Sequence, residues 1–374
     1  MTAPATEVWL CPDRLFDGTM LHSGLALGVA GGMATRIAPP PAGPCMRVSG
    51  TLSPGFIDLQ VNGGGDVLLN AAPTAEAMQA IAAAHRRFGT TAILPTVISD
   101  TPEVLARVVG AALQAKSLPG LLGLHIEGPH LALSRRGAHR ADVLRPLDAT
   151  TLAHIRRLRV AGIAVMITLA PEAATSAQIA SLAALGAVVS IGHSNATAEQ
   201  ANAALAAGAR CFTHLFNAMS QMEGRRPGVT GAALTSTAHV GIICDGPHVA
   251  DAMVGLAVRS RPVPDRCFLV SDAMPTVGGS DRFRLDDREV RLVAGRLQTE
   301  DGTLAGAHLT MAQAVARLIT VVGIAPDIAL RMATSVPARL IGAPQRAILP
   351  GQPLSDLLIL DADWQVTGTC AGLY

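Results

Sequence analysis

Eight short apolar runs alternate with segments of helical character between residues 52 and 270 of this chain. Strands that alternate with helices form parallel sheets, and eight such units predict a (β/α)8 TIM-like barrel of the α/β class. A doubly wound open sheet is the competing interpretation, but no Gly-x-Gly-x-x-Gly motif follows any of the runs. The expected strands are 52–61, 92–98, 121–126, 163–169, 187–191, 210–215, 240–244 and 267–270, and the clearest helices are 74–88, 102–116, 149–160, 250–259 and 309–322.

Both ends of the chain have the pattern of a smaller β structure. Residues 1–50 contain short alternating segments around two turn signals, at 17–18 and 31–32, and a run of three prolines at 39–41 interrupts them. The carboxyl end is strand-like again from Ile348 onward. We therefore expect residues 1–50 and 345–374 to form one small composite β-sandwich domain beside a catalytic barrel domain of residues 51–344.

Two histidines follow consecutive strand-like runs in the segment 187–219. Thr197 and Gln200 have the spacing of a capping box, which predicts a helix between the two runs. Because such a helix makes the strands parallel, His193 and His214 are expected at the same carboxyl end, where α/β folds bind ligands. One histidine in such a place is more often a hydrogen-bonded core residue, but two on successive strands favour a metal site.

Polar residues follow the other strands at the same end of the predicted barrel. Glu127 comes after the third run, and Asp272 comes after the eighth. One carboxylate and two imidazoles make a three-ligand site for a divalent metal ion, and Asp272 is then placed to act as a base. Taken singly, Glu127 as a structural ion-pair partner and Asp272 as a helix cap are reasonable alternatives. Their shared position at one end of the barrel favours the catalytic interpretation.

Composition and charge exclude several function classes. The net charge of +1 and the 3% aromatic content argue against nucleic-acid binding, and no apolar run reaches the roughly 18 residues of a membrane span. The six cysteines are scattered without a Cys-x-x-Cys pair, so we expect neither a disulfide scaffold nor a zinc knuckle and favour a reducing compartment. The first residues lack a signal-peptide pattern, which predicts a cytoplasmic protein.

Eight motifs in chain order carry a family resemblance. They are PGFIDLQVNG (54–63), HIEGP (125–129), GHS (192–194), HLFNAM (214–219), GRRPG (224–228), DGPHV (245–249), SDA (271–273) and DGTLAG (301–306). With them the sequence resembles the N-acetylglucosamine-6-phosphate deacetylase family of the amidohydrolase superfamily. The resemblance implies the metal-dependent amidohydrolase type of barrel, and the terminal β segments match the small domain of that family.

The resemblance assigns roles to individual residues of this chain. It implies that the metal ion is held by Glu127, His193 and His214. It also implies that Asp272 is the general base and acid and that His139 contacts the acetamide oxygen. For the rest of the substrate, it implies that Asn217 and the backbone around Ala218 line the sugar phosphate, and that Arg225 and His248 bind phosphate and sugar across the interface of a homodimer. The superfamily's His-x-His on the first strand is replaced by Gln60-x-Asn62. Because neutral amides are poor zinc ligands, we expect one divalent ion, Zn2+ before Fe2+, Mn2+ or Co2+.

The implied activity is hydrolysis of N-acetyl-D-glucosamine 6-phosphate to D-glucosamine 6-phosphate and acetate, in amino-sugar metabolism. The alternatives are the galactosamine isomer, another N-acyl substrate, or a non-catalytic sugar-phosphate sensor. The sensor ranks low because Asp272 and the three metal ligands are all present. His130 stands where a bulky apolar residue is usual in the family, and we expect it at the surface or behind the site, without a catalytic role.

Overall fold

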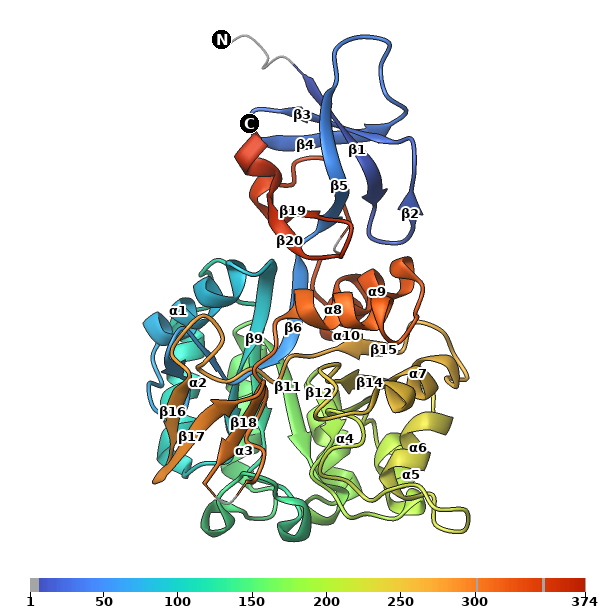
Figure 1. The fold of residues 1–374 in the computed structure, drawn as a ribbon. Helices are drawn as coiled ribbons and strands as arrows, with labels where there is room; N and C mark the ends of the chain where they lie inside the picture. Colours follow the sequence, from blue (N-terminus) through green and yellow to red (C-terminus); the bar gives the residue numbers. More distant parts are fainter. Residues whose placement is uncertain (1–6, 301, 345–346, 374) are drawn as a thin grey trace.

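The computed structural model describes residues 7–300, 302–344 and 347–373. A barrel of eight parallel strands forms its main body, and a smaller β-rich part lies at one end of the barrel (Figure 1). Within these residues, no helix combines the length and the apolar character that crossing a membrane requires.

The barrel strands pair in the order in which they follow one another along the chain. Each neighbouring pair is parallel, and a parallel bridge between Val61 and Ala273 brings the two edges of the sheet together. The predicted (β/α)8 barrel is confirmed. Its strands are β6 (Phe56–Val61), β9 (Thr90–Ile98), β10 (Gly123–Glu127), β11 (Ala164–Leu169), β12 (Val188–Ile191), β13 (Cys211–Phe212), β14 (His239–Ile242) and β15 (Cys267–Leu269).

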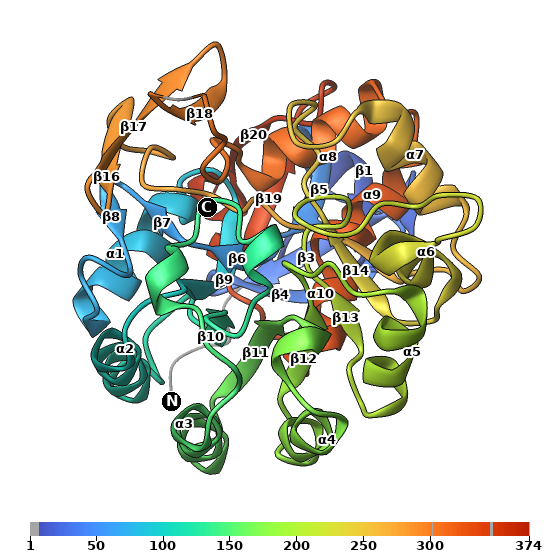
Figure 2. The same ribbon diagram turned by 90° about the horizontal axis from the view of Figure 1, so that it is seen from below.

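Helices surround the strands (Figure 2). Most of them begin at a Thr or Asp whose side chain accepts a hydrogen bond from the first turn, as at Thr197, where Gln200 completes the predicted capping box. The helices are α1 (Ala75–Arg86), α2 (Pro102–Gln114), α3 (Ala149–Val160), α4 (Ser176–Ala184), α5 (Ala198–Ala206), α6 (Gly228–Thr235), α7 (Asp251–Arg259), α8 (Met311–Thr320), α9 (Pro326–Ala333) and α10 (Ser335–Ile341). Short 3-10 helices span Leu133–Arg135, Ala141–Val143, Pro171–Ala173, Leu354–Asp356 and Cys370–Leu373.

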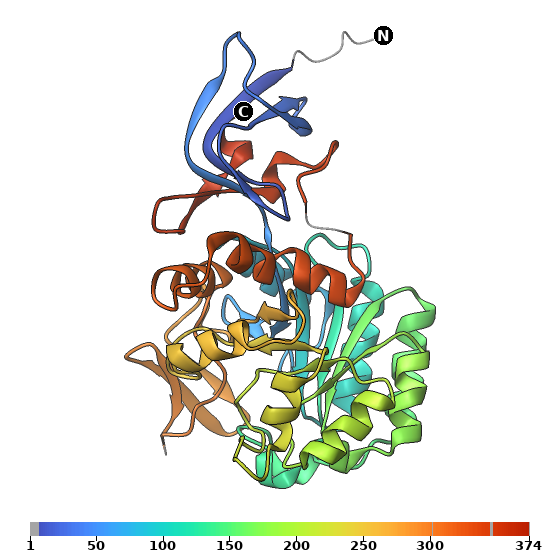
Figure 3. The same ribbon diagram turned by 90° about the vertical axis from the view of Figure 1, so that its right-hand side faces the viewer.

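Strands from both ends of the chain form one seven-stranded sheet around a small core of their own. The predicted composite β-rich domain is confirmed, whereas its exact residue boundaries stay a prediction. Because β6 begins just after β5 ends, this sheet lies at the amino end of the barrel (Figure 3). Its strands are β1 (Val8–Phe16), β2 (Leu21–His22), β3 (Ala26–Ala30), β4 (Met33–Ala38), β5 (Met46–Pro54), β19 (Leu357–Leu360) and β20 (Val366–Thr369).

A three-stranded antiparallel sheet is inserted between β15 and α8, which the sequence interpretation did not include. Leu285, Val290 and Leu297 of this insert pack in one apolar cluster with Leu68 and Met274. The insert therefore packs against the carboxyl end of the barrel, beside the loops that follow β6 and β15. Its strands are β16 (Arg282–Leu285), β17 (Arg288–Val293) and β18 (Arg296–Thr299), and a two-stranded ribbon of β7 (Gly63–Gly64) and β8 (Val67–Leu68) lies next to it (Figure 2).

The cysteines differ in part from the sequence-based expectation. Cys11 of β1 forms a disulfide with Cys45, just before β5, while the other four cysteines are free and buried. A single bridge is no disulfide scaffold, but it runs against the expectation of a reducing compartment, where structural disulfides are rare. No spacing pattern in the sequence indicates this pair, because the two residues meet only through the parallel pairing of β1 with β5.

Candidate active site

Three polar residues at the carboxyl end of the barrel share an unusual backbone conformation. His193, His214 and Asp272 have φ angles of 47°, 30° and 51°, in the left-handed region that side chains other than glycine rarely adopt. These residues lie two or three positions after the ends of their strands, so the extended conformation does not continue through them. Such backbone conformations persist where the surroundings hold them in place, and they gather at functional sites.

Glu127, His193 and His214 converge on one point. The Oε1 atom of Glu127 lies 3.1 Å from Nε2 of His214 and 3.3 Å from Nε2 of His193, and the two nitrogens are 3.0 Å apart. Ligand atoms around a tetrahedral ion with bonds of about 2.0–2.1 Å are separated by about 3.3–3.5 Å. The three atoms lie at or slightly inside these separations, so a small movement apart would let them hold a divalent metal ion, and both donor types suit zinc.

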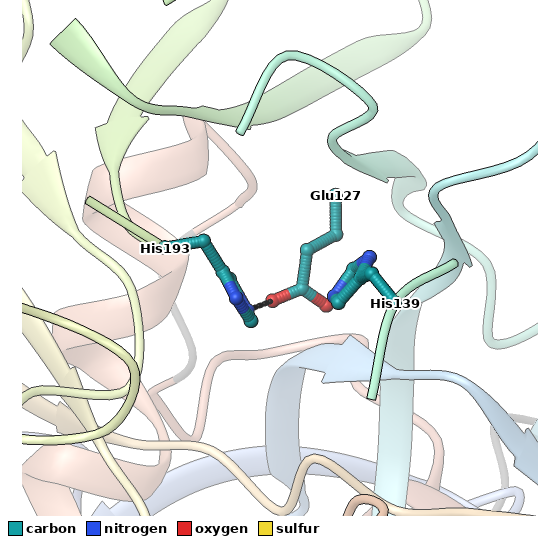
Figure 4. A group of neighbouring side chains, drawn as sticks. All are labelled: Glu127, His139 and His193. Atoms are coloured by element: carbon teal, nitrogen blue, oxygen red, sulfur yellow. Dashed lines mark ion pairs between the residues drawn. The ribbon is translucent and has the colours of Figure 1, made fainter. Parts of the chain in front are cut away.

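His139 lies beside this triad and is a rival candidate ligand. Glu127, His139 and His193 offer nitrogen and oxygen atoms that all lie within 4.8 Å of one another (Figure 4). The atoms of Glu127, His193 and His214 are closer together, within 3.3 Å. We therefore prefer His214 to His139 as the third ligand.

Hydrogen bonds and charges shift the pKa values of Glu127 and His214. Burial by itself raises the pKa of Glu127, but its hydrogen bonds to His193 and His214 and their charges hold it well below its usual range. For His214 burial has the opposite effect and by itself lowers the pKa. The hydrogen bond to Glu127 and its charge outweigh burial, so the pKa of His214 is raised. His193 is oriented from behind, because its Nδ1 lies 2.9 Å from the backbone oxygen of Arg135.

Asp272 faces the triad and is held by the two amides that replace the superfamily's histidines. Nδ2 of Asn62 donates to Oδ1 of Asp272 at 2.7 Å, and Nε2 of Gln60 donates to it at 3.2 Å and to Oε1 of Glu127 at 3.0 Å. Burial, followed by the negative charge of Glu127, raises the pKa of Asp272 to about 6. Gln60 and Asn62 thus support the carboxylates with hydrogen bonds.

His139 is buried next to His193, with ring centroids 4.5 Å apart. The backbone N–H of Ser99 donates to its Nδ1 at 3.2 Å, and the Ser99 hydroxyl lies 2.7 Å from the same atom. Since Nδ1 accepts, the neutral ring carries its proton on Nε2. Burial, and next the charge of His193, lower the pKa of His139 to about 3, so the ring stays neutral at pH 7 and offers one N–H donor.

Ser99 supports His139 and was missed in the sequence, since it lies 40 residues away and matches no motif. Replacing Ser99 with alanine removes the hydroxyl partner of His139 but keeps the backbone N–H. We expect kcat to fall by about tenfold, the range for loss of one orienting hydrogen bond behind a functional histidine. Steady-state kinetics against Ser181→Ala, a serine on the outer helix α4, give the comparison. An unchanged kcat would mean that the backbone bond alone orients the ring.

A cavity of about 180 Å³ opens over these residues. Its polar floor contains Asn62, Glu127, His139, His193, His214 and Asp272, and the predicted Asn217, Ala218 and His248 also line it. The wall is apolar and contains Ile98, Met274, Leu285 and Leu304. The insert thus supplies part of the wall through Leu285, and Arg288 of β17 donates to the backbone oxygen of Ala138, next to His139, at 2.7 Å.

The residues predicted to bind phosphate and sugar separate in the structure. His248 lines the cavity of its own chain, where its Nδ1 lies 2.6 Å from Oδ2 of Asp245, and its expected contact with a neighbouring subunit's substrate stays a prediction. Arg225 is exposed on the loop before α6 and does not line that cavity. The structure thus separates the two residues, and the contact of Arg225 with a neighbouring subunit's site also stays a prediction.

His130 is fully buried, which corrects the expectation of a surface position. Its Nδ1 lies 3.1 Å from the backbone oxygen of Arg145, and its Nε2 lies 3.0 Å from the hydroxyl of Thr151. It links the loop after β10 to α3 and does not line the active-site cavity. The prediction that it stands behind the site, without a catalytic role, agrees with these contacts.

Known proteins of similar sequence and structure share this site's scaffold. Residues 51–347 match the family described as "Amidohydrolase family". The chain is 42% identical, over 85% of its length and 81% of the relative's, to the N-acetylgalactosamine-6-phosphate deacetylase of Shewanella sp. (strain ANA-3).

Two solved structures are similar over nearly the whole chain. The N-acetylglucosamine-6-phosphate deacetylase of Pasteurella multocida has a TM-score of 0.90 and 32% identity, covering 97% of this chain and 98% of that one. A mutant of the Mycobacterium smegmatis N-acetyl-D-glucosamine-6-phosphate deacetylase, in complex with N-acetyl-D-glucosamine-6-phosphate, has a TM-score of 0.89 and 33% identity over 98% of each chain. The chain therefore belongs to the amidohydrolase family and is a hydrolase of that family.

Proposed function

We propose that this chain hydrolyses the acetamide of N-acetyl-D-glucosamine 6-phosphate to D-glucosamine 6-phosphate and acetate. The observation that carries the proposal is the triad of Glu127, His193 and His214, which faces the buried carboxylate of Asp272 across one cavity. Amide hydrolysis needs an activated water, a stabilised oxyanion and a proton for the leaving amine. The arrangement offers a group for each need, and the solved relatives named after this substrate support its identity.

Glu127, His193 and His214 would hold one divalent ion, with Zn2+ preferred to Fe2+, Mn2+ or Co2+. An ion bound there supplies Lewis-acid chemistry, which polarises a carbonyl and makes water more acidic. Gln60 and Asn62 turn their amide hydrogens toward Glu127 and Asp272, which supports a site for one ion and not two.

Asp272 acts as the base and then as the acid. It accepts a proton from the water whose oxygen bonds to the carbonyl carbon, and it returns the proton to the amide nitrogen as the C–N bond breaks. The products are acetate and the free amine. A pKa of about 6 suits this double role, because the carboxylate is ionised at pH 7 and still holds a proton well enough to transfer it.

His139 stabilises the oxygen of the acetamide. Its neutral ring keeps a proton on Nε2, since Nδ1 accepts from Ser99. An N–H fixed before the reaction begins lowers the energy of the developing oxyanion without reorganisation. The apolar wall beside it, with Ile98 and Met274, is suited to the acetyl methyl group, while Asn217 and the backbone of Ala218 face the sugar phosphate.

Arg225 binds the phosphate of a substrate held by the neighbouring subunit of a homodimer. The exposure of Arg225 and its absence from the cavity of its own chain support this assignment. Replacing Arg225 with alanine is expected to raise KM for the phosphorylated substrate by about a hundredfold, the loss of one charged contact, and to change activity on the unphosphorylated sugar little. Arg226→Ala is the matched control, because Arg226 is exposed on the same loop and pairs with Glu223.

Mixing two defective variants tests the shared site directly. In a heterodimer of Arg225→Ala and Asp272→Asn, the site that keeps Asp272 receives its Arg225 from the other chain. Random reassembly should therefore restore about a quarter of wild-type activity at low substrate concentration. If the mixture is no more active than the sum of its parts, Arg225 serves its own chain or none.

N-acetyl-D-galactosamine 6-phosphate is the second candidate substrate. The specific observation in its favour is the 42% identity to a relative named for that isomer. The two sugars differ only in the configuration at C4, so the same triad, Asp272 and His139 serve either one. The choice between them rests on contacts to one hydroxyl group.

Acetate release tests the proposal and separates the candidates. Protein stripped of metal with a chelator is assayed before and after addition of Zn2+, Fe2+, Mn2+ or Co2+, on both phosphorylated isomers and on unphosphorylated N-acetylglucosamine. We expect metal-dependent release that is selective for a phosphorylated sugar, with kcat/KM highest for the glucosamine isomer. A higher kcat/KM for the galactosamine isomer would replace the first candidate by the second. No release from folded protein with any metal would reject both.

A further inference from the structure

A second cavity, of about 440 Å³, opens at the end of the barrel opposite the active site. It lies where three consecutive strands begin: Arg210 precedes β13, His239 is the first residue of β14, and Arg266 precedes β15. Arg339 of α10 also lines the cavity, together with the hydroxyl-bearing Ser236 and Thr237. Three guanidinium groups and an imidazole from four separate elements thus surround one space.

The positive charges in this cavity have no acidic partner among the residues that the structure describes. No carboxylate there lies within 4.0 Å of Arg210, Arg266 or Arg339, whereas Asp265, next to Arg266 in sequence, pairs with Arg331 at 3.0 Å. Like charges gathered at one place repel each other and favour binding of an anion. The cavity is therefore a local positive centre on a chain whose net charge is only +1.

Most of the hydrogen-bond donors of these arginines remain available. Arg266 uses Nη1 on Nε2 of His239 at 3.2 Å, and its buried Nε has no partner among the described residues. Arg210 makes one long bond, 3.4 Å, to the backbone oxygen of Leu340, at the end of α10. Arg261 nearby behaves differently, since it donates to the backbone oxygens of Ala233 and Ala238 and does not line the cavity.

His239 adds no charge to the cavity at neutral pH. Burial, and then the charges of Arg266, Arg339 and Arg210, lower its pKa to about 4. Nε2 of the neutral ring accepts the hydrogen bond of Arg266 and so orients that guanidinium at the edge of the cavity. The attraction for an anion thus comes from the three arginines, and the histidine positions one of them.

We propose that this cavity binds a small phosphate-bearing metabolite, with Arg210, Arg266 and Arg339 around the phosphate group. Planar guanidinium groups match the geometry of phosphate oxygens, and the dianion offsets more of the clustered charge than a monovalent anion. Hydroxyl groups such as those of Ser236 and Thr237 are common further partners of phosphate. A concave space of this volume suits a small molecule better than a membrane surface or a nucleic acid.

Calorimetric titration with inorganic phosphate and with glucose 6-phosphate tests the site. Ionic strength is held constant with sodium chloride so that general salt effects cancel. The test variants are Arg339→Ala and Arg210→Ala, both exposed and remote from the catalytic residues, so acetate release should be unchanged and should report correct folding. We expect each to weaken the affinity by at least about tenfold. Tighter binding of the sugar phosphate than of inorganic phosphate would point to a cavity that also contacts the sugar.

Two control variants make the result specific. Arg107→Ala removes an exposed arginine on α2 outside the cavity, and Arg225→Ala removes the proposed phosphate contact of the active site. Both should keep the affinity of the wild type for this second site. Binding that is lost in Arg225→Ala and kept in Arg339→Ala and Arg210→Ala would overturn the proposal, as would the absence of any heat beyond that of added chloride.

Discussion

Replacing Asp272 with asparagine is expected to lower kcat by about a thousandfold, which is within the range that general acid–base catalysis contributes. The amide keeps the size of the carboxylate and can retain a contact with Asn62, so the fold and the metal content should be unchanged. It cannot accept the proton of the attacking water. Acetate release, circular dichroism and metal analysis of the purified variant check the three parts of this expectation.

Asp287→Asn is the matched control for that experiment, since Asp287 is an exposed carboxylate of the insert that does not line the cavity. It should keep wild-type kcat. A near-normal kcat for the Asp272 variant would remove Asp272 from the mechanism and direct attention to another base.

The dependence of activity on pH follows from the same residue. Burial and the charge of Glu127 raise the pKa of Asp272 to about 6, and the reaction begins with its ionised form. Activity should therefore be full above this value and fall as the pH drops through it, while a bound cation moves the fall to lower pH because it favours the carboxylate. Profiles of kcat/KM against pH, recorded with two different metals, measure this fall in activity at low pH. An acid limb that persists unchanged in the asparagine variant would belong to another group.

Replacing Glu127 with glutamine is the second change of large expected effect. The variant loses the one negatively charged ligand of the triad, and neutral amides bind zinc poorly. We expect metal affinity and kcat/KM to fall together, each by at least about a hundredfold, the upper range found when only an outer partner of a ligand is lost. Metal content after dialysis and acetate release with excess metal measure the two effects.

Glu199→Gln provides the control, because Glu199 is an exposed carboxylate in the first turn of α5. A companion variant, His139→Ala, separates the rival ligand sets. It should lose activity and keep its metal, since His139 is assigned to the substrate oxygen. If His139→Ala loses the metal while His214→Ala keeps it, the ligand set is Glu127, His139 and His193.

The barrel could be predicted from the sequence because its strands are continuous apolar runs that are buried on both faces. The start of α5 could also be predicted, since Thr197 and Gln200 form a capping box, which is a local sequence pattern. The strand expected at 210–215 is shorter than predicted, at Cys211–Phe212. The left-handed backbone of His214, which serves the site, ends the extended conformation early.

The insert escaped prediction because it exposes one face and is rich in charge. Leu285, Val290 and Leu297 alternate with arginines and acids, so no continuous apolar run marks its strands. Its packing against Met274 is a contact between distant parts of the chain, which local patterns do not encode. The part of the cavity wall that comes from Leu285 was missed for the same reason.

The active site also contains residues that could be predicted from the sequence and residues that could not. Glu127, His193 and Asp272 could be located because each lies at or just after the carboxyl end of a strand, and a barrel brings these ends to one place. The residues that support them could not be located. The contacts of Ser99 with His139 and of the amides with Asp272 depend on side-chain directions across strands. The burial of His130 and the position of His248 within its own chain depend on loop conformations in the same way.

The barrel closes at the residue next to the proposed base. The backbone oxygen of Ala273 accepts from the N–H groups of Asn62 and Gly63 at 2.9 and 3.1 Å, and Asn62 also holds Asp272, 210 positions along the chain. Joining such distant segments costs more chain entropy than pairing neighbouring strands, so this contact is expected late in folding. Enzymatic activity regained after dilution from denaturant would therefore report completion of the ring, at a stage when circular dichroism already registers the helices.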